Sequence, residues 1–299
     1  MTRGKRLREI PLHLMVLPGV LCTIIFSYIP MMGIIIAFQK FVPTLGIFKS
    51  KFVGLENIRY MLELPNIYSV IWNTVFIAVM KIIAGMAIPI IFALLLNEIG
   101  NKFLKRSVQT IIYLPFFLSW VILGGILIDI LSPSTGFVNQ IMGAVGIKPV
   151  FFLGDEKWFP FTLILSDTWK NFGYNTVIYL AALTAIDPTL YEASIVDGAN
   201  RWKQTLHVTI PGMMPIIMLM AVLSLGNVLN AGFEQVFNLY SPQVYSTGDI
   251  IDTLVYRIGL VNFQYGLSTA IGLFKSLISF GLIVLSNKLA YKYAGYRVF

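Results

Sequence analysis

Six long apolar segments, separated by shorter polar ones, constrain the fold of this chain more than any other feature. Crossing the hydrocarbon core of a bilayer takes about 20 apolar residues of helix. Hydrophobic residues make up 57% of the 299 residues and charged residues only 12%, about half the charged fraction of a soluble domain. The sequence predicts an all-α, polytopic membrane protein with six transmembrane helices at Leu12–Ala37, Val70–Leu96, Val108–Leu131, Phe159–Leu183, Gly212–Ala231 and Leu267–Leu285.

The fourth segment is the least apolar, because Asp167, Lys170 and Asn171 lie in its middle. Apolar turns flank these residues on both sides, so we retain it as a span. The first segment follows a basic stretch, but it is too long for the apolar part of a secretory signal and no small-residue cleavage site follows it. We therefore expect a retained first helix.

Lys and Arg residues predict the orientation in the membrane, because cytoplasmic segments of membrane proteins are enriched in them. With the N-terminus inside, most of the Lys and Arg residues fall in cytoplasmic segments, although the outer loops are longer in total. This bias predicts a cytoplasmic N-terminus at residues 1–11, one transmembrane domain at 12–290 and a cytoplasmic C-terminus at 291–299. It also places the polar segment 187–211 in the cytoplasm, and it explains the net charge of +8 without nucleic acid.

The segment 187–211 predicts two short helices joined by a turn. Asp187 is suited to cap a helix that begins at Pro188, and Gly198 is suited to the left-handed conformation that ends a helix. A second helix is expected from about Asn200 towards Pro211. On the first helix, Leu190, Ala193 and Val196 recur at helical spacing and form one apolar stripe. Such a stripe favours docking into a partner's groove, and the alternative is an ordinary amphipathic helix at the membrane surface.

The residues of this segment match a known pattern. Glu192-Ala193-Ser194 is followed after three residues by Gly198, and after nine more by Val208-Thr209-Ile210-Pro211. This resembles the cytoplasmic coupling loop of ABC importer permeases, E-A-A-x3-G-x9-I-x-L-P. Ser194 in place of alanine, and Val208 and Ile210 in place of Ile and Leu, keep size and polarity nearly unchanged.

The resemblance extends beyond the loop. Asp167-Thr168-Trp169-Lys170-Asn171-Phe172-Gly173-Tyr174-Asn175, Asp197-Gly198-Ala199-Asn200-Arg201-Trp202 and Ser286-Asn287-Lys288-Leu289 are similar to the MalF-type sugar permeases, especially the branch that handles oligosaccharides from plant or algal polysaccharides, such as alginate-type permeases. The resemblance covers most of the chain. It implies the type I ABC importer fold, MetI/MalF-like, with a cytoplasmic coupling helix.

The resemblance also implies the partners. A second homologous permease subunit, expected to be a different chain, an ABC ATPase dimer and an extracellular or periplasmic sugar-binding protein would complete an importer in the bacterial cytoplasmic membrane. The ATPase would be contacted by Glu192, Ala193, Ser194, Asp197, Gly198, Ala199 and Pro211. Because this chain has no G-x-x-x-x-G-K-[ST] phosphate loop, ATP and Mg²⁺ are expected on the partner ATPase and no cofactor on this chain.

Polar and aromatic residues inside the expected spans are candidates for the substrate path, because ionisable groups there are costly and usually functional. Sugars bind by stacking on aromatic rings and by hydrogen bonds to amides and carboxylates. These considerations select Trp120, Asp167, Trp169, Lys170, Asn171, Tyr174 and Asn175. The alternative for Asp167 and Lys170 is a simple ion pair, since they are three residues apart on one helical face.

Charge in the spans suggests one further hypothesis about the substrate. Three embedded cations, Lys81, Lys170 and Lys275, exceed the two embedded carboxylates, Asp129 and Asp167. A cavity with a net positive charge would favour oligosaccharides of uronic acids over neutral ones.

Two other classes of function compete with the ABC permease. A gradient-driven secondary sugar transporter would show corresponding broken segments in the two chain halves, and none is seen. An intramembrane enzyme would need a nucleophile or a metal set, and the chain has no H-E-x-x-H motif and a single cysteine, Cys22. We therefore expect a transport subunit without catalytic or metal-ligating residues.

Overall fold

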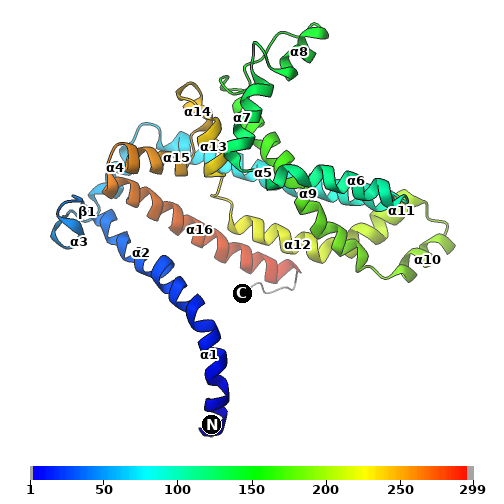
Figure 1. Cartoon of the computed structure of the whole chain (residues 1–299), viewed down its shortest axis with the longest axis horizontal. Helices are drawn as coiled ribbons and strands as arrows, with labels where there is room; N and C mark the ends of the chain where they lie inside the picture. The colour runs from blue at the N-terminus through cyan, green and yellow to red at the C-terminus, as the bar shows by residue number, and fades with distance from the viewer. Residues whose placement is uncertain (1–2, 295–299) are drawn as a thin grey trace. The chain divides into compact units, whose positions relative to one another are not determined.

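The structure, a computed structural model, describes residues 3–294 and divides into two compact units (Figure 1). The first unit comprises Met1–Pro65 and Val255–Phe274, and the second comprises Asn66–Leu254 and Lys275–Phe299. The predicted cytoplasmic termini, 1–11 and 291–299, fall partly outside the described residues.

The first unit is a long helical segment followed by a small hairpin and short helices. Asn57 connects these parts, because its side-chain amide donates to the carbonyls of Ala37 at 2.9 Å and Gln39 at 3.0 Å. Phe41 packs edge-on against Tyr265, with ring centroids 5.8 Å apart. The elements of this unit are α1 (Arg3–Thr23), a π-helical turn at Ile24–Tyr28, α2 (Ile29–Met31), a 3₁₀ segment at Met32–Phe38, β1 (Gln39–Lys40), α3 (Gly46–Lys49), β2 (Lys51–Phe52), antiparallel to β1, α4 (Glu56–Glu63) and a π-helical turn at Arg257–Val261.

The second unit is built on two long helices, α5 (Ile67–Glu98) and α9 (Phe159–Thr184), which pack along each other (Figure 1). The other elements are α6 (Lys102–Tyr113), η3 (Leu114–Phe117), α7 (Trp120–Leu131), α8 (Phe137–Ala144), α10 (Pro188–Val196), α11 (Arg201–Gln204), η4 (Thr205–Thr209), α12 (Ile210–Gly226), α13 (Phe233–Leu239), η5 (Pro242–Val244) and α14 (Tyr245–Gly248). Helices α15 (Ile251–Tyr256) and α16 (Tyr265–Ala294) contribute to both units.

Two apolar clusters hold α5 and α9 together. One surrounds Ile77 of α5 and Leu163 of α9, both fully buried. The other surrounds Ala93 of α5 and Tyr179 of α9, near the opposite ends of the two helices. The middle of the helix pair therefore lies between two packed regions.

All six predicted spans correspond to helical segments. By length and apolar composition, however, fewer than six of these segments qualify as membrane-spanning helices. Among the described residues, four helices are long and apolar enough to cross a membrane: Pro11–Phe38, Ile67–Glu98, Arg201–Gly226 and Tyr265–Lys288. A fifth is added if the bent pair Lys102–Phe117 and Trp120–Leu131 counts as one span. Helix α9 has 26 residues but is less apolar than these four, because Asp167, Lys170, Asn171 and Asn175 lie along it.

The predicted third span, Val108–Leu131, is not one straight helix. Its two parts meet at 104° between η3 and α7. Pro115 has no N–H to continue the helical hydrogen bonds, and Ser119 begins a new helix by accepting a hydrogen bond from the amide of Ile122 at 3.3 Å. Backbone carbonyls at such a break need other donors, because lipid supplies none.

Lys170 of α9 supplies these donors. Its ammonium group donates to the carbonyls of Phe116 at 2.9 Å, Pro115 at 3.4 Å and Leu118. The aromatic rings of Phe116 and Trp120 lie over it, with centroids 5.8 and 5.6 Å away. The buried lysine therefore stabilises the bend and attaches it to α9.

Lys170→Met is expected to destabilise the protein by about 1–3 kcal/mol, because it leaves carbonyls at the break without a donor. Lys170→Arg keeps N–H donors and should retain more of the stability. Thermal unfolding of the purified importer complex measures both. Lys157→Met, at an exposed lysine of the loop before α9, is the control and should leave the transition unchanged. An unchanged transition in Lys170→Met would contradict this role.

Candidate functional site

A cavity of about 270 Å³, lined by both polar and apolar residues, lies between the two apolar clusters, where α5, α9 and α12 meet. Asp167, Asn171, Asn175 and Tyr179 are spaced by four residues and thus occupy one face of α9. The complete lining is Ala78, Lys81, Ile82, Gly85 and Met86 of α5, Asp167, Thr168, Asn171, Asn175 and Tyr179 of α9, Met220 and Ser224 of α12, and Asn227, Asn230, Ala231 and Gly232 of the following segment.

Lys81 is the cation of this lining and Asp167 its carboxylate. The Lys81 Nζ lies 3.7 Å from Oδ1 of Asp167, and it donates to the carbonyl of Ala231 at 2.6 Å and to Oε1 of Gln235. Lys81 is 9% exposed and Asp167 24%. The lysine is therefore held inside the wall, while the carboxylate is more open.

Gln235 extends this network into the core. Its side-chain nitrogen donates to the carbonyl of Leu163 at 2.7 Å and to Oγ of Ser166 at 2.8 Å, so both ends of the amide are used. Gly232 approaches the same ammonium group closely, since a Cβ there would lie 3.0 Å from Nζ. Its φ of +90° is also unfavourable for other residues, so both observations require glycine at this position.

The structure gathers three of the seven predicted path residues at the cavity and not the other four. Asp167, Asn171 and Asn175 line it. Trp169 and Tyr174 lie on other faces of α9, and the Tyr174 ring stacks on Phe116 with centroids 4.0 Å apart. Trp120 and Lys170 belong to the bend described above. Helical periodicity is the physical reason on α9, because the cavity residues occupy one face of the helix and Trp169, Lys170 and Tyr174 fall outside it. Trp120 belongs to α7.

The hypothesis that three embedded cations give the cavity a net positive charge is also corrected. Of Lys81, Lys170 and Lys275, only Lys81 lines the cavity. Lys170 donates to backbone carbonyls, and Lys275 pairs with Asp252 at 2.5 Å, a carboxylate that we did not count as embedded. The pairing of Asp167 with Lys170 is replaced by the pairing with Lys81. The charge of the cavity is thus one ion pair and not a net excess of cations.

Sequence reasoning missed the polar residues that follow α12. We expected the fifth span to continue to Ala231, but the helix ends at Gly226, and the irregular segment that follows contributes Asn227, Asn230 and Gly232 to the cavity. Irregular backbone at membrane depth occurs where it lines a cavity or is buried in protein. In the sequence, Asn227, Asn230 and Gly232 could have indicated that the helix ends before them.

The segment 187–211 forms the two helical arms that the sequence predicted. Asp187 caps α10 by accepting a hydrogen bond from the Thr189 amide at 2.9 Å, which lowers the pKa of this carboxyl. Gly198 ends the first arm with φ of +73°. Asn200 caps the second arm through the Lys203 amide at 2.9 Å. The hydroxyls of Tyr191 and Thr209, 3.1 Å apart, link the two arms.

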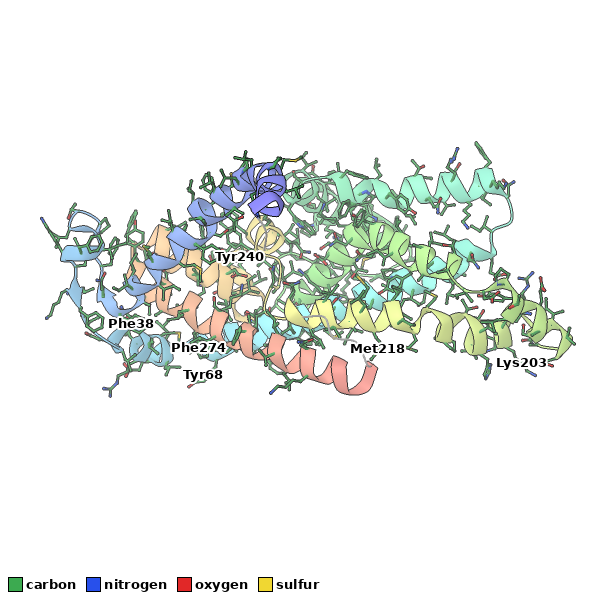
Figure 2. The ribbon with its side chains drawn as sticks, turned by 90° about the horizontal axis from the view of Figure 1, so that it is seen from below. Phe38, Tyr68, Lys203, Met218, Tyr240 and Phe274 are labelled. Carbon is green, nitrogen blue, oxygen red and sulfur yellow. The ribbon has the colours of Figure 1, made fainter. Side chains whose placement is uncertain are left out.

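The second arm leads past Pro211 into the fifth predicted span. It continues through η4 into α12 without a break, so that Lys203 and Met218 lie on one helical run (Figure 2). Pro211 stands at the second position of α12, where no intrahelical donor is lost. The arm is therefore a direct extension of a helix that lines the cavity.

The first arm presents an exposed surface. No residue of α10 is buried, and Val196 is 87% exposed. Leu190 and Ala193 of the predicted stripe are also exposed, as are Glu192 and Asp197. Trp202 of the second arm is 70% exposed. Apolar and acidic groups are thus available together at this end of the second unit.

Comparison with known proteins shows the family. Residues 85–290 match the binding-protein-dependent transport system inner membrane component. The chain belongs to this family of importer permeases. It is 39% identical, over 97% of its length and 90% of the relative's, to the polygalacturonan/rhamnogalacturonan transport system permease protein YteP of Bacillus subtilis (strain 168). It is 37% identical to Protein LplB of the same organism, over 94% and 89% of the two chains.

A solved structure supports the same conclusion. The permease matches, with a TM-score of 0.89 and 35% identity over 97% of this chain and 98% of the other, a chain in the crystal structure of a bacterial ABC transporter involved in the import of the acidic polysaccharide alginate. The prediction of an ABC importer permease, a transport subunit rather than an enzyme, is confirmed. In this family ATP hydrolysis belongs to a separate partner chain, and the permease is embedded in the membrane.

Asp187→Ala is expected to speed hydrogen exchange of the amides in α10, because the first turn loses its cap. Because the pKa of Asp187 is lowered in the folded protein, its carboxylate stabilises α10 fully at any pH above the ordinary aspartate pKa. This stabilisation is lost as the pH falls through the lowered pKa. The wild-type protein and Asp187→Ala are compared at the same pH. Their exchange rates should converge only at a pH below the ordinary aspartate pKa. Asp155→Ala removes a similar hydrogen bond, to the Lys157 amide, and is the control. Equal exchange in wild type and Asp187→Ala at neutral pH would contradict the assignment.

Proposed function

We propose that this permease carries acidic oligosaccharides into a bacterial cell as one of two permease subunits of an ATP-driven importer. The observation that carries the proposal is the cavity in the second unit, which contains an ion pair and several amides and is lined by the two helices that the segment 187–211 joins. Both termini lie in the cytoplasm in this proposal, as does the exposed surface of α10. A binding protein outside the membrane delivers the substrate.

The proposed substrate class rests on the relatives and on the groups in the cavity. One relative is named for polygalacturonan and rhamnogalacturonan, and the similar transporter structure is described as importing alginate. These polymers carry carboxylates on their sugar rings. The cavity offers amides of Asn171, Asn175, Asn227 and Asn230 for sugar hydroxyls, and Lys81 for a carboxylate. A carbohydrate with acidic groups matches this combination of donors.

The proposed coupling follows from connectivity. Helix α9 lines the cavity and leads at Thr184 into the segment 187–211, and the second arm of that segment continues into α12, which also lines the cavity. We expect an ATPase subunit, which holds ATP and Mg²⁺, to bind the exposed face of α10 and the turn after it. The residues of this proposed contact are Glu192, Ala193, Ser194, Asp197, Gly198 and Ala199, with Pro211 on the second arm. Closure of the ATPase dimer would then move both cavity helices together, as in other nucleotide-driven rigid-body transitions.

The energy source tests the proposal against a gradient-driven transporter. The complete importer, reconstituted in proteoliposomes with trigalacturonate and the binding protein on the side opposite to the ATPase, should accumulate the sugar only with Mg-ATP on the ATPase side. Ionophores that abolish ion gradients should leave uptake unchanged. Uptake that follows an ion gradient and persists without ATP would refute the proposed function.

Glu192→Lys is expected to lower ATP-driven uptake about tenfold or more, because it reverses a charge in the proposed ATPase contact. The variant should still insert and purify, since Glu192 is exposed. Uptake and ATPase activity of the reconstituted complex are measured together, and the ratio of sugar moved to ATP hydrolysed should fall. Glu63→Lys, at an exposed glutamate of α4, is the matched control. Normal coupling in Glu192→Lys would remove α10 from the ATPase contact.

A further inference from the structure

The cavity contains an ion pair that is incompletely formed. An ammonium group has three N–H donors. Two of them are used by Lys81 in its hydrogen bonds to the carbonyl of Ala231 and to Gln235. The third N–H is left for Asp167. Oδ1 of Asp167 is 3.7 Å from the Lys81 Nζ, which is longer than a hydrogen bond. Lys81 is thus fixed by neutral acceptors and only loosely paired with its counter-ion.

The two charges differ in how they are held. Lys81 is almost fully buried, and the residues on two sides of it, Gly232 and Gln235, are packed against its ammonium group. Asp167 has more than twice the exposed fraction and lines the cavity from α9. A carboxylate that enters the cavity therefore meets a cation that is already in position. The resident carboxylate has room to move away.

We propose that Lys81 recognises the carboxylate of an acidic sugar and that Asp167 is an internal counter-ion which this carboxylate displaces. This inference rests on the proposed function. A buried cation without any counter-ion is costly, so an empty cavity needs Asp167. The incoming carboxylate takes the third N–H of Lys81 in a charge-assisted hydrogen bond, the stronger kind of hydrogen bond. A neutral sugar has no group that can replace Asp167.

Displacement also accounts for release. A cation committed to substrate alone would hold an acidic sugar tightly, whereas transport requires a site that is strong enough to fill and weak enough to empty. Asp167 competes for Lys81 in every cycle and so limits the affinity. Substrate selection and substrate release are then two consequences of one ion pair.

The test compares an acidic sugar with its neutral form. Uptake of trigalacturonate and of its fully methyl-esterified derivative is measured with the complete importer in proteoliposomes. The binding protein is the same in every preparation, so its own preference cancels in the ratio of variant to wild type. Lys81→Met should lower uptake of trigalacturonate about tenfold or more relative to the ester, the size expected for a hydrogen bond to a charged group. Asp167→Asn should lower the KM for trigalacturonate and also lower its maximal rate.

Two further variants separate recognition from folding. Lys81→Met combined with Asp167→Asn removes both charges, so no lone charge stays buried, and it should show the same loss of acid preference. Lys275→Met breaks the half-buried pair with Asp252, which does not line the cavity. It should change the uptake of both sugars in equal proportion.

The outcomes distinguish this inference from the proposed function. If the wild-type importer takes up trigalacturonate but Lys81→Met lowers both sugars equally, the displacement is wrong and the proposed function stands. The same conclusion follows if Lys275→Met changes the preference as Lys81→Met does. If the wild-type importer takes up only the ester, the acidic substrate is wrong and the inference fails with it.

Discussion

Buried and partly buried ammonium groups organise the second unit, because each needs acceptors where the bilayer supplies no water. Lys81 connects α5 to the segment after α12 through the carbonyl of Ala231 and through Gln235. Lys170 connects α9 to the break between η3 and α7. Lys275 connects α16 to Asp252 of α15. Lys81 and Lys170 thus join elements that are distant in the sequence, and the positions of the cavity and of the bend depend on these two contacts.

The cavity and the segment 187–211 belong to one continuous path of helix. Helix α9 faces the cavity with Asp167, Thr168, Asn171, Asn175 and Tyr179 and ends beside α10. The second arm returns as α12 to the cavity at Met220 and Ser224. A displacement of the arms therefore reaches the cavity through two helices rather than through a flexible linker. The hydroxyl contact between Tyr191 and Thr209 links the two arms directly. This arrangement suits a permease whose energy comes from a separate ATPase chain.

Local sequence signals predicted the segment 187–211 well. Capping by Asp187 and Asn200 and the positive φ of Gly198 follow from residues within a few positions of each other, so they need no tertiary information. The spans were predicted from hydropathy for the same reason, with boundaries that shifted by several residues. The bend between η3 and α7 was not predicted, although Pro115 and Ser119 mark it. Proline alone does not break a membrane helix, because neighbouring side chains can satisfy the freed carbonyls, and Lys170 is 52 residues from Leu118.

The sequence by itself determined the class of protein, since apolar segments of this length are stable only as helices in a membrane, and the polar loop carries its own helix signals. It also determined which residues carry charges inside apolar segments, where burying an unpaired charge is costly and requires a partner or a function. Only the tertiary structure decided which partner each charge has. Asp167 pairs with Lys81, 86 positions earlier, and not with Lys170 on its own helix, because packing against α5 brings Lys81 to the cavity face of α9 while Lys170 points to the bend. The partner of a charge is set by which helical faces meet, and no local pattern in the chain records that.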